Sequence, residues 1–216
     1  FLKPFVASIQ GRRPVPGVYP WLLSLGSRNR RRAGGLQYCP VCFVQGMAYY
    51  TRESRFAWHT ACERHQVMLK DCCALCGAAI CPHLLTMPSI DLSRCHRCGH
   101  LLATAETAPA LMDALRFQAC ADSAFTNHRG FFGEEELSVA DWFYTARWLL
   151  SFLHGAALSR FPSANIFLAE MGLDLQGYPD SHGLAFECRS PASRAFLLGH
   201  CFCLMQAGPI QFEIAL

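Results

Sequence analysis

The chain has 216 residues, of which 52% are hydrophobic and only 16% are charged, whereas an average domain carries about 25% charged residues. This composition indicates that partners cover part of the apolar surface. It does not indicate a membrane protein. The best candidate segment, residues 142–158, is interrupted by Arg147 and His154, so we expect no transmembrane helix. No secretory signal pattern opens the sequence either.

The net charge of +3 is unevenly distributed along the chain. Residues 1–104 contain 13 Lys and Arg against 4 Asp and Glu, a net of +9, while residues 105–216 contain 6 against 12, a net of −6. A basic half joined to an acidic half predicts different neighbours for the two. Nucleic-acid phosphate is the natural partner of the basic half, and a solvated charged face is the plain alternative.

Residues 1–36 are predicted to form an extended basic N-terminal arm, because several prolines and glycines exclude a long regular helix. The arm contains an arginine cluster: Arg28, Arg30, Arg31 and Arg32. A cluster of this kind ahead of Gly34 and Gly35 suits a loop that contacts the phosphates of nucleic acid. Contact with an acidic protein surface and a merely solvated loop are the alternatives.

Residues 37–104 contain eight Cys and His residues in four pairs, each pair with two residues between its members. The first set is Cys39, Cys42, Cys62 and His65, and the second is Cys73, Cys76, Cys95 and Cys98. Two ligands at this spacing can reach one metal from a single tight turn, and a second pair completes the tetrahedron of a structural zinc site. We therefore predict a double zinc-binding module with two structural Zn²⁺ ions, rather than disulfides or buried free thiols.

Two local expectations accompany the zinc module. Gly77 and Gly99 follow the second Cys of their pairs, where a positive φ lets backbone N–H groups approach the sulfurs. The aromatic segment 47–59 is expected to lead into a helix that carries Cys62 and His65. Its aromatic rings are expected to cover the zinc site rather than stack on bases.

Other cysteines near the module fit less well as ligands. Cys72 could replace Cys73, but only Cys73 keeps the two-residue spacing to its partner. A third site at Cys81 and His83 lacks a matching pair.

Residues 105–216 are predicted to form a helical interaction domain with few strand signals. Apolar spacing and capping residues place the helices. The expected helices run from Pro109 to Cys120, from Trp142 to Leu158 behind the capping segment Ser138 to Asp141, from Ser163 to Met171 before Gly172, and from Ser190 and Pro191 to Gly208 and Pro209. The expected fold class is mainly α with small zinc-ribbon-like elements of minor β character, a two-zinc module followed by a helical domain.

Residues 35–100 resemble the TniQ-type transposition proteins. The segments that carry the resemblance are Gly35–Cys42, Tyr49–Arg52, Cys62–His65, Met68–Leu69, Asp71–Gly77 and Cys95–Gly99. An ordered set of this kind is far more specific than a single C-x-x-C pair. The family usually has a tryptophan eight residues before its third ligand, where this chain has Ser54, with Trp58 nearer.

The resemblance implies a non-catalytic target-selection adaptor of a Tn7-like transposon. Such proteins link a targeting element to the AAA+ transposition regulator. The targeting element is either target DNA or, in CRISPR-associated transposons, an effector complex with guide RNA. The resemblance also implies a bacterial cytoplasmic protein, in keeping with reduced cysteines, and it leaves a homodimer open.

Two other function classes compete with the adaptor. A sequence-specific DNA-binding zinc-finger protein, either a target-site reader or a transcription regulator, would carry the same metal sites. A zinc enzyme would need three protein ligands and a bound water. A nucleobase deaminase would need H-x-E ahead of P-C-x-x-C, and neither element is present. We therefore expect no catalytic residues.

Overall fold

The computed structural model describes residues 19–23, 35–86, 90–158, 162–179 and 185–215. These residues fold as two compact units. The cysteine-rich unit comprises described residues 19–23, 35–86, 90–110 and 185–194, and the helical unit comprises 111–158, 162–179 and 195–215. Most of the predicted arm, including Arg28, Arg30, Arg31 and Arg32, lies outside the described residues.

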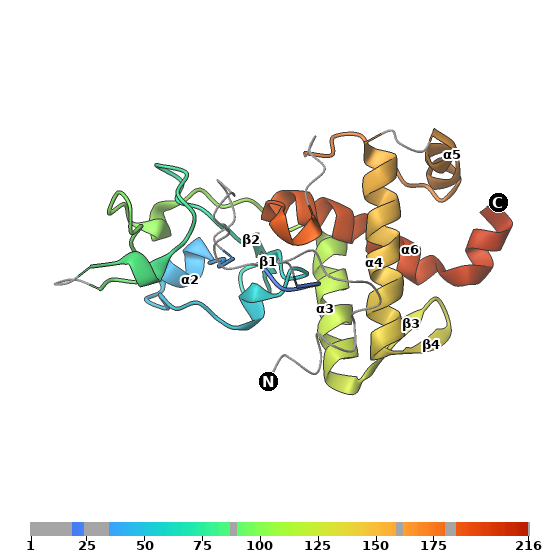
Figure 1. Ribbon diagram of the computed structural model, residues 1–216, viewed down its shortest axis with the longest axis horizontal. Helices are drawn as coiled ribbons and strands as arrows, with labels where there is room; N and C mark the ends of the chain where they lie inside the picture. Colours follow the sequence, from blue (N-terminus) through green and yellow to red (C-terminus); the bar gives the residue numbers. More distant parts are fainter. Residues whose placement is uncertain (1–18, 24–34, 87–89, 159–161, 180–184, 216) are drawn as a thin grey trace. The chain divides into compact units, whose positions relative to one another are not determined.

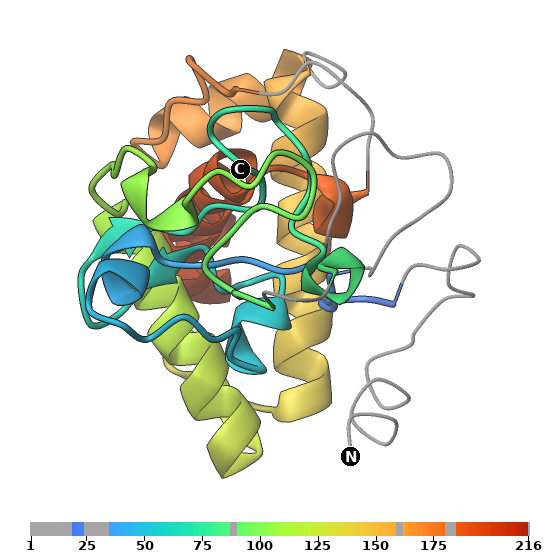
Figure 2. The same ribbon diagram turned by 90° about the vertical axis from the view of Figure 1, so that its left-hand side faces the viewer.

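The cysteine-rich unit contains little regular secondary structure and consists mainly of loops and single turns, as Figure 2 shows. Its elements are α2 (Pro40–Val44), η1 (Glu53–Arg55), β1 (Ala61–Cys62), β2 (Val67–Met68), η2 (Pro82–Leu84), η3 (Leu102–Thr104) and η4 (Phe186–Cys188). Strands β1 and β2 pair antiparallel, with Ala61 opposite Met68 and Cys62 opposite Val67.

The prediction that a helix carries Cys62 and His65 is therefore wrong. Cys62 ends a two-residue strand, and His65 lies in the turn that follows it. Gln66 closes this turn with a φ of 51° and donates its N–H to the Cys62 carbonyl at 2.7 Å. A residue in the left-handed region ends a helix rather than continuing it.

The core of this unit combines aromatic rings with cysteine side chains. Its buried members are Tyr38, Phe43, Cys73, Ala78, Ile80, Cys95, Leu102 and Ala105. The Phe43 ring lies 5.1 Å from that of Tyr38 and 5.6 Å from that of Tyr50. Burial is the main reason why the pKa values of both tyrosines are raised. Tyr50 thus packs beside the metal-ligand candidates, whereas Tyr49 is 58% exposed.

A second part of the cysteine-rich unit is built around a buried arginine. Arg194 is 1% exposed and donates to Gln37 Oε1 at 2.6 Å. Its other donors reach the backbone carbonyl oxygens of Ala57, His59 and Arg189. Burial lowers the pKa of Arg194 to about 10, against the opposing effect of nearby carboxylates.

Residues close to Arg194 extend this polar network into an aromatic cluster. The backbone N–H of Trp21 donates to Glu187 Oε1 at 2.8 Å. The Trp21 ring meets the Trp58 ring edge-on at 6.0 Å and the Phe186 ring at 5.7 Å. Trp58 in turn stacks on Phe56 at 4.3 Å. Segment 185–194 is thereby packed against residues far earlier in the sequence.

The helical unit contains four helices and one hairpin among its described residues (Figure 1). They are α3 (Met112–Asn127), β3 (Arg129–Phe132), β4 (Glu135–Ser138), α4 (Val139–Ala157), α5 (Pro162–Glu170) and α6 (Pro191–Ala215), whose first turn belongs to the cysteine-rich unit. The predicted cap of α4 is confirmed, because Ser138 Oγ accepts the N–H of Asp141. About half of the described residues are helical and two small antiparallel sheets are present among them, which is compatible with the predicted mainly α fold of minor β character.

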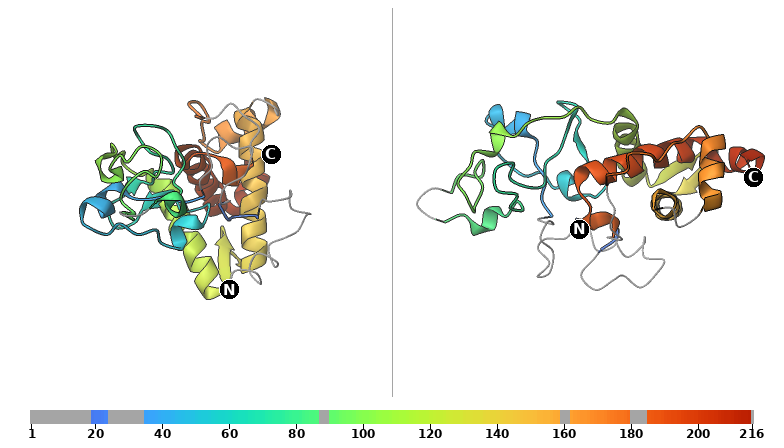
Figure 3. Two further views of the ribbon diagram at one scale, coloured as in Figure 1. Left: turned by 60° about the vertical axis from the view of Figure 1, so that its left-hand side comes forward. Right: turned by 90° about the horizontal axis from the view of Figure 1, so that it is seen from above.

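The β3–β4 hairpin is an element that the sequence analysis missed. It lies beside α3 and α4, as the views in Figure 3 show. Gly130 faces the Trp142 ring so closely that a Cβ there would lie 2.7 Å from Trp142 Cγ. The Trp142 Nε1–H donates to the Phe131 carbonyl at 3.0 Å. A glycine in this strand is therefore required by the close approach of the indole.

The turn of the hairpin contacts a break in α6. Gly208 has φ 70° and ψ −177°, so the first run of α6 ends where Gly208 and Pro209 were expected to stop it, and a further helical turn follows. Gly133 donates its N–H to the Met205 carbonyl at 2.7 Å. A Cβ at Gly208 would lie 2.6 Å from Gly133 Cα, so neither glycine leaves room for a side chain.

By length and composition, one helix among the described residues could cross a membrane, namely Pro191–Ile214 of α6. Its most apolar window is 44% buried inside the protein. This is weak evidence, because a core helix passes the same test. From the sequence, residues 142–158 were the best membrane candidate. Residues 191–209 were expected to be helical but were not a membrane candidate, because Gln206, Gly208 and Pro209 interrupt the apolar run of α6.

We predict that Arg194→Met lowers the free energy of unfolding by about 3–5 kcal/mol, because it leaves buried carbonyls and Gln37 without their donor. Urea unfolding at a fixed zinc concentration measures the change. The exposed Arg116 pairs only with Asp113 at a surface site, so Arg116→Met should change stability by less than about 0.5 kcal/mol. Equal losses in both variants would contradict the role of the buried network.

Candidate metal centres

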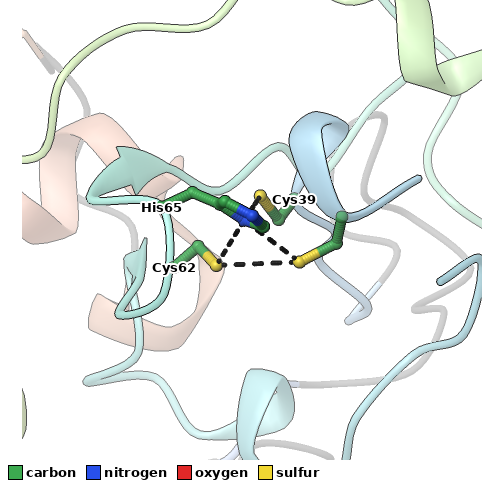
Figure 4. Close-up of side chains that lie close together, drawn as sticks. Cys39, Cys62 and His65 are labelled. Atoms are coloured by element: carbon green, nitrogen blue, oxygen red, sulfur yellow. Dashed lines mark hydrogen bonds between the residues drawn. The ribbon is translucent and has the colours of Figure 1, made fainter. Parts of the chain in front are cut away.

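The first cluster of metal-ligand candidates is formed by Cys39, Cys42, Cys62 and His65 and is called the Cys₃His cluster. Cys39 is the N-cap residue of α2, and Cys42 lies in the first turn of that helix. Cys62 and His65 come from β1 and the turn after it. Figure 4 shows the His65 ring directed at the sulfurs of Cys39 and Cys62.

Distances in the Cys₃His cluster are those of a tetrahedron around one ion. His65 Nδ1 lies 3.5 Å from the sulfur of Cys39 and 3.4 Å from those of Cys42 and Cys62. The Cys42 and Cys62 sulfurs are 3.8 Å apart. Tetrahedral zinc with Zn–S near 2.3 Å and Zn–N near 2.0–2.1 Å places two sulfurs about 3.8 Å apart and a sulfur and nitrogen about 3.5 Å apart.

Gln45 orients the histidine of this cluster. Its Oε1 lies 3.2 Å from His65 Nε2, at the C-terminal end of α2. If Nδ1 binds a metal, Nε2 carries the ring proton, and the Nε2–H donates a hydrogen bond to Gln45 Oε1. An outer partner of this kind fixes the tautomer and the ring plane of a metal-binding histidine. Gln45 was missed from the sequence, because its position relative to His65 depends on the fold.

The second cluster is formed by Cys73, Cys76, Cys95 and Cys98 and is called the Cys₄ cluster. Its closest sulfur pairs are Cys73 with Cys98 and Cys76 with Cys95, both at 3.7 Å. A disulfide requires about 2.05 Å, and the part of the chain that the structure describes contains no disulfide. The cluster therefore has the separations of four ligands around one ion rather than of two disulfides.

Two matching turns build the Cys₄ cluster. Gly77 donates its N–H to the Cys73 carbonyl and Gly99 to the Cys95 carbonyl, both at 2.9 Å. Their φ values are 67° and 71°, as expected from the sequence. A Cβ at either glycine would meet no atom within 4 Å, so conformation rather than space requires glycine here.

The electrostatics of the clusters favour a cation. The backbone N–H of Ala78 lowers the pKa of Cys76 to about 7, so this thiol is readily ionised. Burial and the nearby thiols of Cys39 and Cys62 raise the pKa of Cys42 to about 12. Several thiolates cannot share so small a volume without a positive charge among them, and a divalent ion supplies it.

The structure brings together all eight residues predicted as ligands, in the two predicted groups, which could bind two metal ions. Cys72 stays outside the Cys₄ cluster while Cys73 joins it, as the spacing favoured. Cys81 and His83 join no cluster among the described residues. The arginine cluster lies outside the described residues, so its predicted role in nucleic-acid contact stays a prediction.

We predict that elemental analysis of the purified chain finds two metal ions per chain and that chelation unfolds the cysteine-rich unit. Cys76→Ser should remove one ion and the packing around Tyr38, because metal binding at such a site is part of the folding free energy. Near-ultraviolet circular dichroism reports that packing. Cys120→Ser, in α3 and outside both clusters, is the matched control and should retain two ions. One ion or none in the unmodified chain would contradict the two-site assignment.

We predict that metal affinity falls with falling pH, because the metal-bound clusters carry fewer protons than the metal-free ones. The raised pKa of Cys42 means that its proton must leave when metal binds. The stability of the metal-free protein should instead fall with rising pH. In the folded, metal-free protein the pKa of Cys42 is raised from the ordinary value of 9 to about 12, so ionisation of Cys42 lowers the free energy of unfolding as pH rises from about 9 to 12.

A colorimetric metal indicator measures this dependence between pH 8 and 5. Release of each ion should be accompanied by uptake of at least about two protons, since thiolate and imidazole ligands bind protons once the metal leaves. Release that does not depend on pH would contradict coordination by thiolates.

No protein-family model, no curated protein and no solved structure matches this chain. The geometry of the two clusters and the residues around them are therefore the basis on which a function is proposed.

Proposed function

We propose that both clusters hold Zn²⁺ and that both ions are structural. Three cysteines with one histidine, and four cysteines, are the donor sets of structural zinc sites, and soft thiolates favour zinc over hard cations such as Mg²⁺. Each cluster already supplies four protein ligands, so a tetrahedral ion keeps no open position for water or substrate. This observation carries the proposal that the chain is not an enzyme.

The proposed function is that of a target-selection adaptor in DNA transposition, linking a targeting complex to an AAA+ transposition regulator. Two closed clusters following one another in the order Cys₃His and Cys₄ support it, together with the TniQ-like segments that supply the eight ligands. In such an adaptor the zinc ions do no chemistry. They hold the loops that carry the recognition residues.

The charge distribution supports contacts of two kinds. Seven of the 13 Lys and Arg residues in the basic half lie in residues 1–34, with no Asp or Glu among them. This segment is suited to nucleic-acid phosphate. The described residues of the helical unit carry nine Asp and Glu against three Arg, which suits contact with protein rather than with nucleic acid. We place this adaptor in the bacterial cytoplasm.

Affinity purification of the full chain from its native host, with mass spectrometry, tests the adaptor. Recovery of an AAA+ ATPase, with target DNA or with a CRISPR effector and its guide RNA, is the expected result. The alternative is a DNA-binding zinc protein that reads a target site by itself. Tight binding of one duplex sequence by the isolated chain, without an ATPase partner, would favour that alternative and contradict the adaptor.

We predict that replacing Arg30, Arg31 and Arg32 together with Ala weakens nucleic-acid binding and leaves metal content unchanged. The plot of log affinity against log salt has a negative slope. Each phosphate contact that is lost reduces the magnitude of this slope by about 0.9, so the loss of three contacts reduces it by up to about 2.7. Filter binding at several salt concentrations measures the slope. Arg116→Ala is the matched control in the acidic half. An unchanged slope in the triple variant would remove this cluster from the interface.

A further inference from the structure

The solvent-exposed side of α4 is unusual for a surface helix. The opposite side of α4 is fully packed: Trp142, Phe143, Ala146, Leu149, Leu150, Leu153 and Ala156 are all buried. A helix of this kind normally shows charged and polar residues to solvent. Here Tyr144 is 56% exposed and Trp148 is 59% exposed. They are four residues apart, so they lie on the same face about 6 Å apart along the axis.

Trp148 is held in place although it is exposed. Its ring stacks on that of Phe152 at 6.0 Å, with 6° between the ring planes. The Phe152 ring meets that of Phe167 in α5 edge-on at 6.0 Å. The Trp148 ring thus packs on Phe152, while more than half of the residue stays exposed to solvent. A rigid aromatic anchor of this kind loses little entropy when a partner binds.

Acidic residues are frequent in the first turn of α4 and in the hairpin that precedes it. Glu134 and Glu135 in the hairpin and Asp141 in the first turn of α4 are all exposed. The hairpin lies against this end of α4, as Figure 1 shows. One neighbouring charge is compensated, because Arg129 pairs with Glu136 at 3.3 Å. Arg147 is the one Lys or Arg residue of α4; it lies between Tyr144 and Trp148 in the sequence and is half-buried.

We propose that Tyr144, Trp148 and the acidic residues Glu134, Glu135 and Asp141 form a docking surface for a basic amphipathic helix of a protein partner. Apolar side chains of the partner would cover the two exposed rings, and its Lys or Arg residues would face the carboxylates. Exposed aromatic rings can also stack on bases, but the exposed carboxylates of the hairpin and of Asp141 repel phosphate, so the charge favours a protein. The surface deepens the proposed function and rests on it for the identity of the partner.

Binding of a model helix to the full zinc-loaded chain tests the surface. The probe is a fluorescein-labelled peptide of 18 residues with Leu at helical spacing and Lys elsewhere. A second probe has Glu in place of every Lys. Fluorescence anisotropy should show that the Lys peptide binds at least about tenfold more tightly than the Glu peptide, because only its charge complements the surface. Trp148→Ala and the double variant Glu134→Lys with Glu135→Lys should each weaken binding of the Lys peptide at least about tenfold.

Matched controls come from the same unit. Met112→Ala removes another exposed apolar side chain, and Glu213→Lys reverses another exposed charge, so both should leave affinity within about twofold. Equal binding of the two peptides, or equal losses in the controls, would overturn the surface. So would loss of single-stranded DNA binding in Trp148→Ala, which would assign the rings to bases. A monomer–dimer equilibrium abolished by the same variant would assign them to a second copy.

The outcome separates the surface from the proposed function. If peptide binding fails while the AAA+ ATPase is still recovered with Trp148→Ala, the surface is wrong and the adaptor stands. If peptide binding holds and no ATPase is recovered, the surface stands and the adaptor is wrong.

Discussion

Two clusters of four Cys and His side chains, each able to surround one metal ion, are the constraint on which the cysteine-rich unit depends. The unit has two two-residue strands, one five-residue helix and a few 3₁₀ turns, which is too little hydrogen-bonded structure to hold its loops. Each cluster brings together segments about 20 residues apart, and closing such loops costs chain entropy that a bound metal ion would offset. Because Cys73 and Cys95 are also core residues beside Tyr38, an ion bound by them would stabilise the core as well as the cluster.

Arg194 provides a second constraint of a different kind. Loops without sheet partners leave backbone carbonyls unpaired, and a guanidinium offers five donors in one plane. Arg194 uses them on carbonyls from two distant parts of the chain and on Gln37. Residues 185–194 thus belong physically to the cysteine-rich unit, although they lie within the acidic half of the sequence. The boundary between basic and acidic halves is therefore not the boundary between folded units.

The features that sequence predicted well are those with local causes. Ligand spacing places the two clusters, and the Ser138 cap places the start of α4, because a few neighbouring residues determine both. The network around Arg194 could not be predicted, since its partners Gln37, Ala57 and His59 are more than 130 residues away. The β3–β4 hairpin was missed because Gly130 and exposed glutamates give it no alternating pattern. It exists because Trp142 packs on its glycine face.

The same reasoning separates the stabilising aromatic residues from the exposed ones. Trp21, Trp58 and Trp142 are buried to within 2% exposure, and each contributes to a core. Trp148 stacks on Phe152 but is 59% exposed, so much of its apolar area stays in contact with water at a free-energy cost. A polar residue at this position would keep the helix and remove that cost. The proposed docking surface accounts for the exposed position of Trp148, and the exposed carboxylates of the hairpin and of Asp141 favour a basic partner.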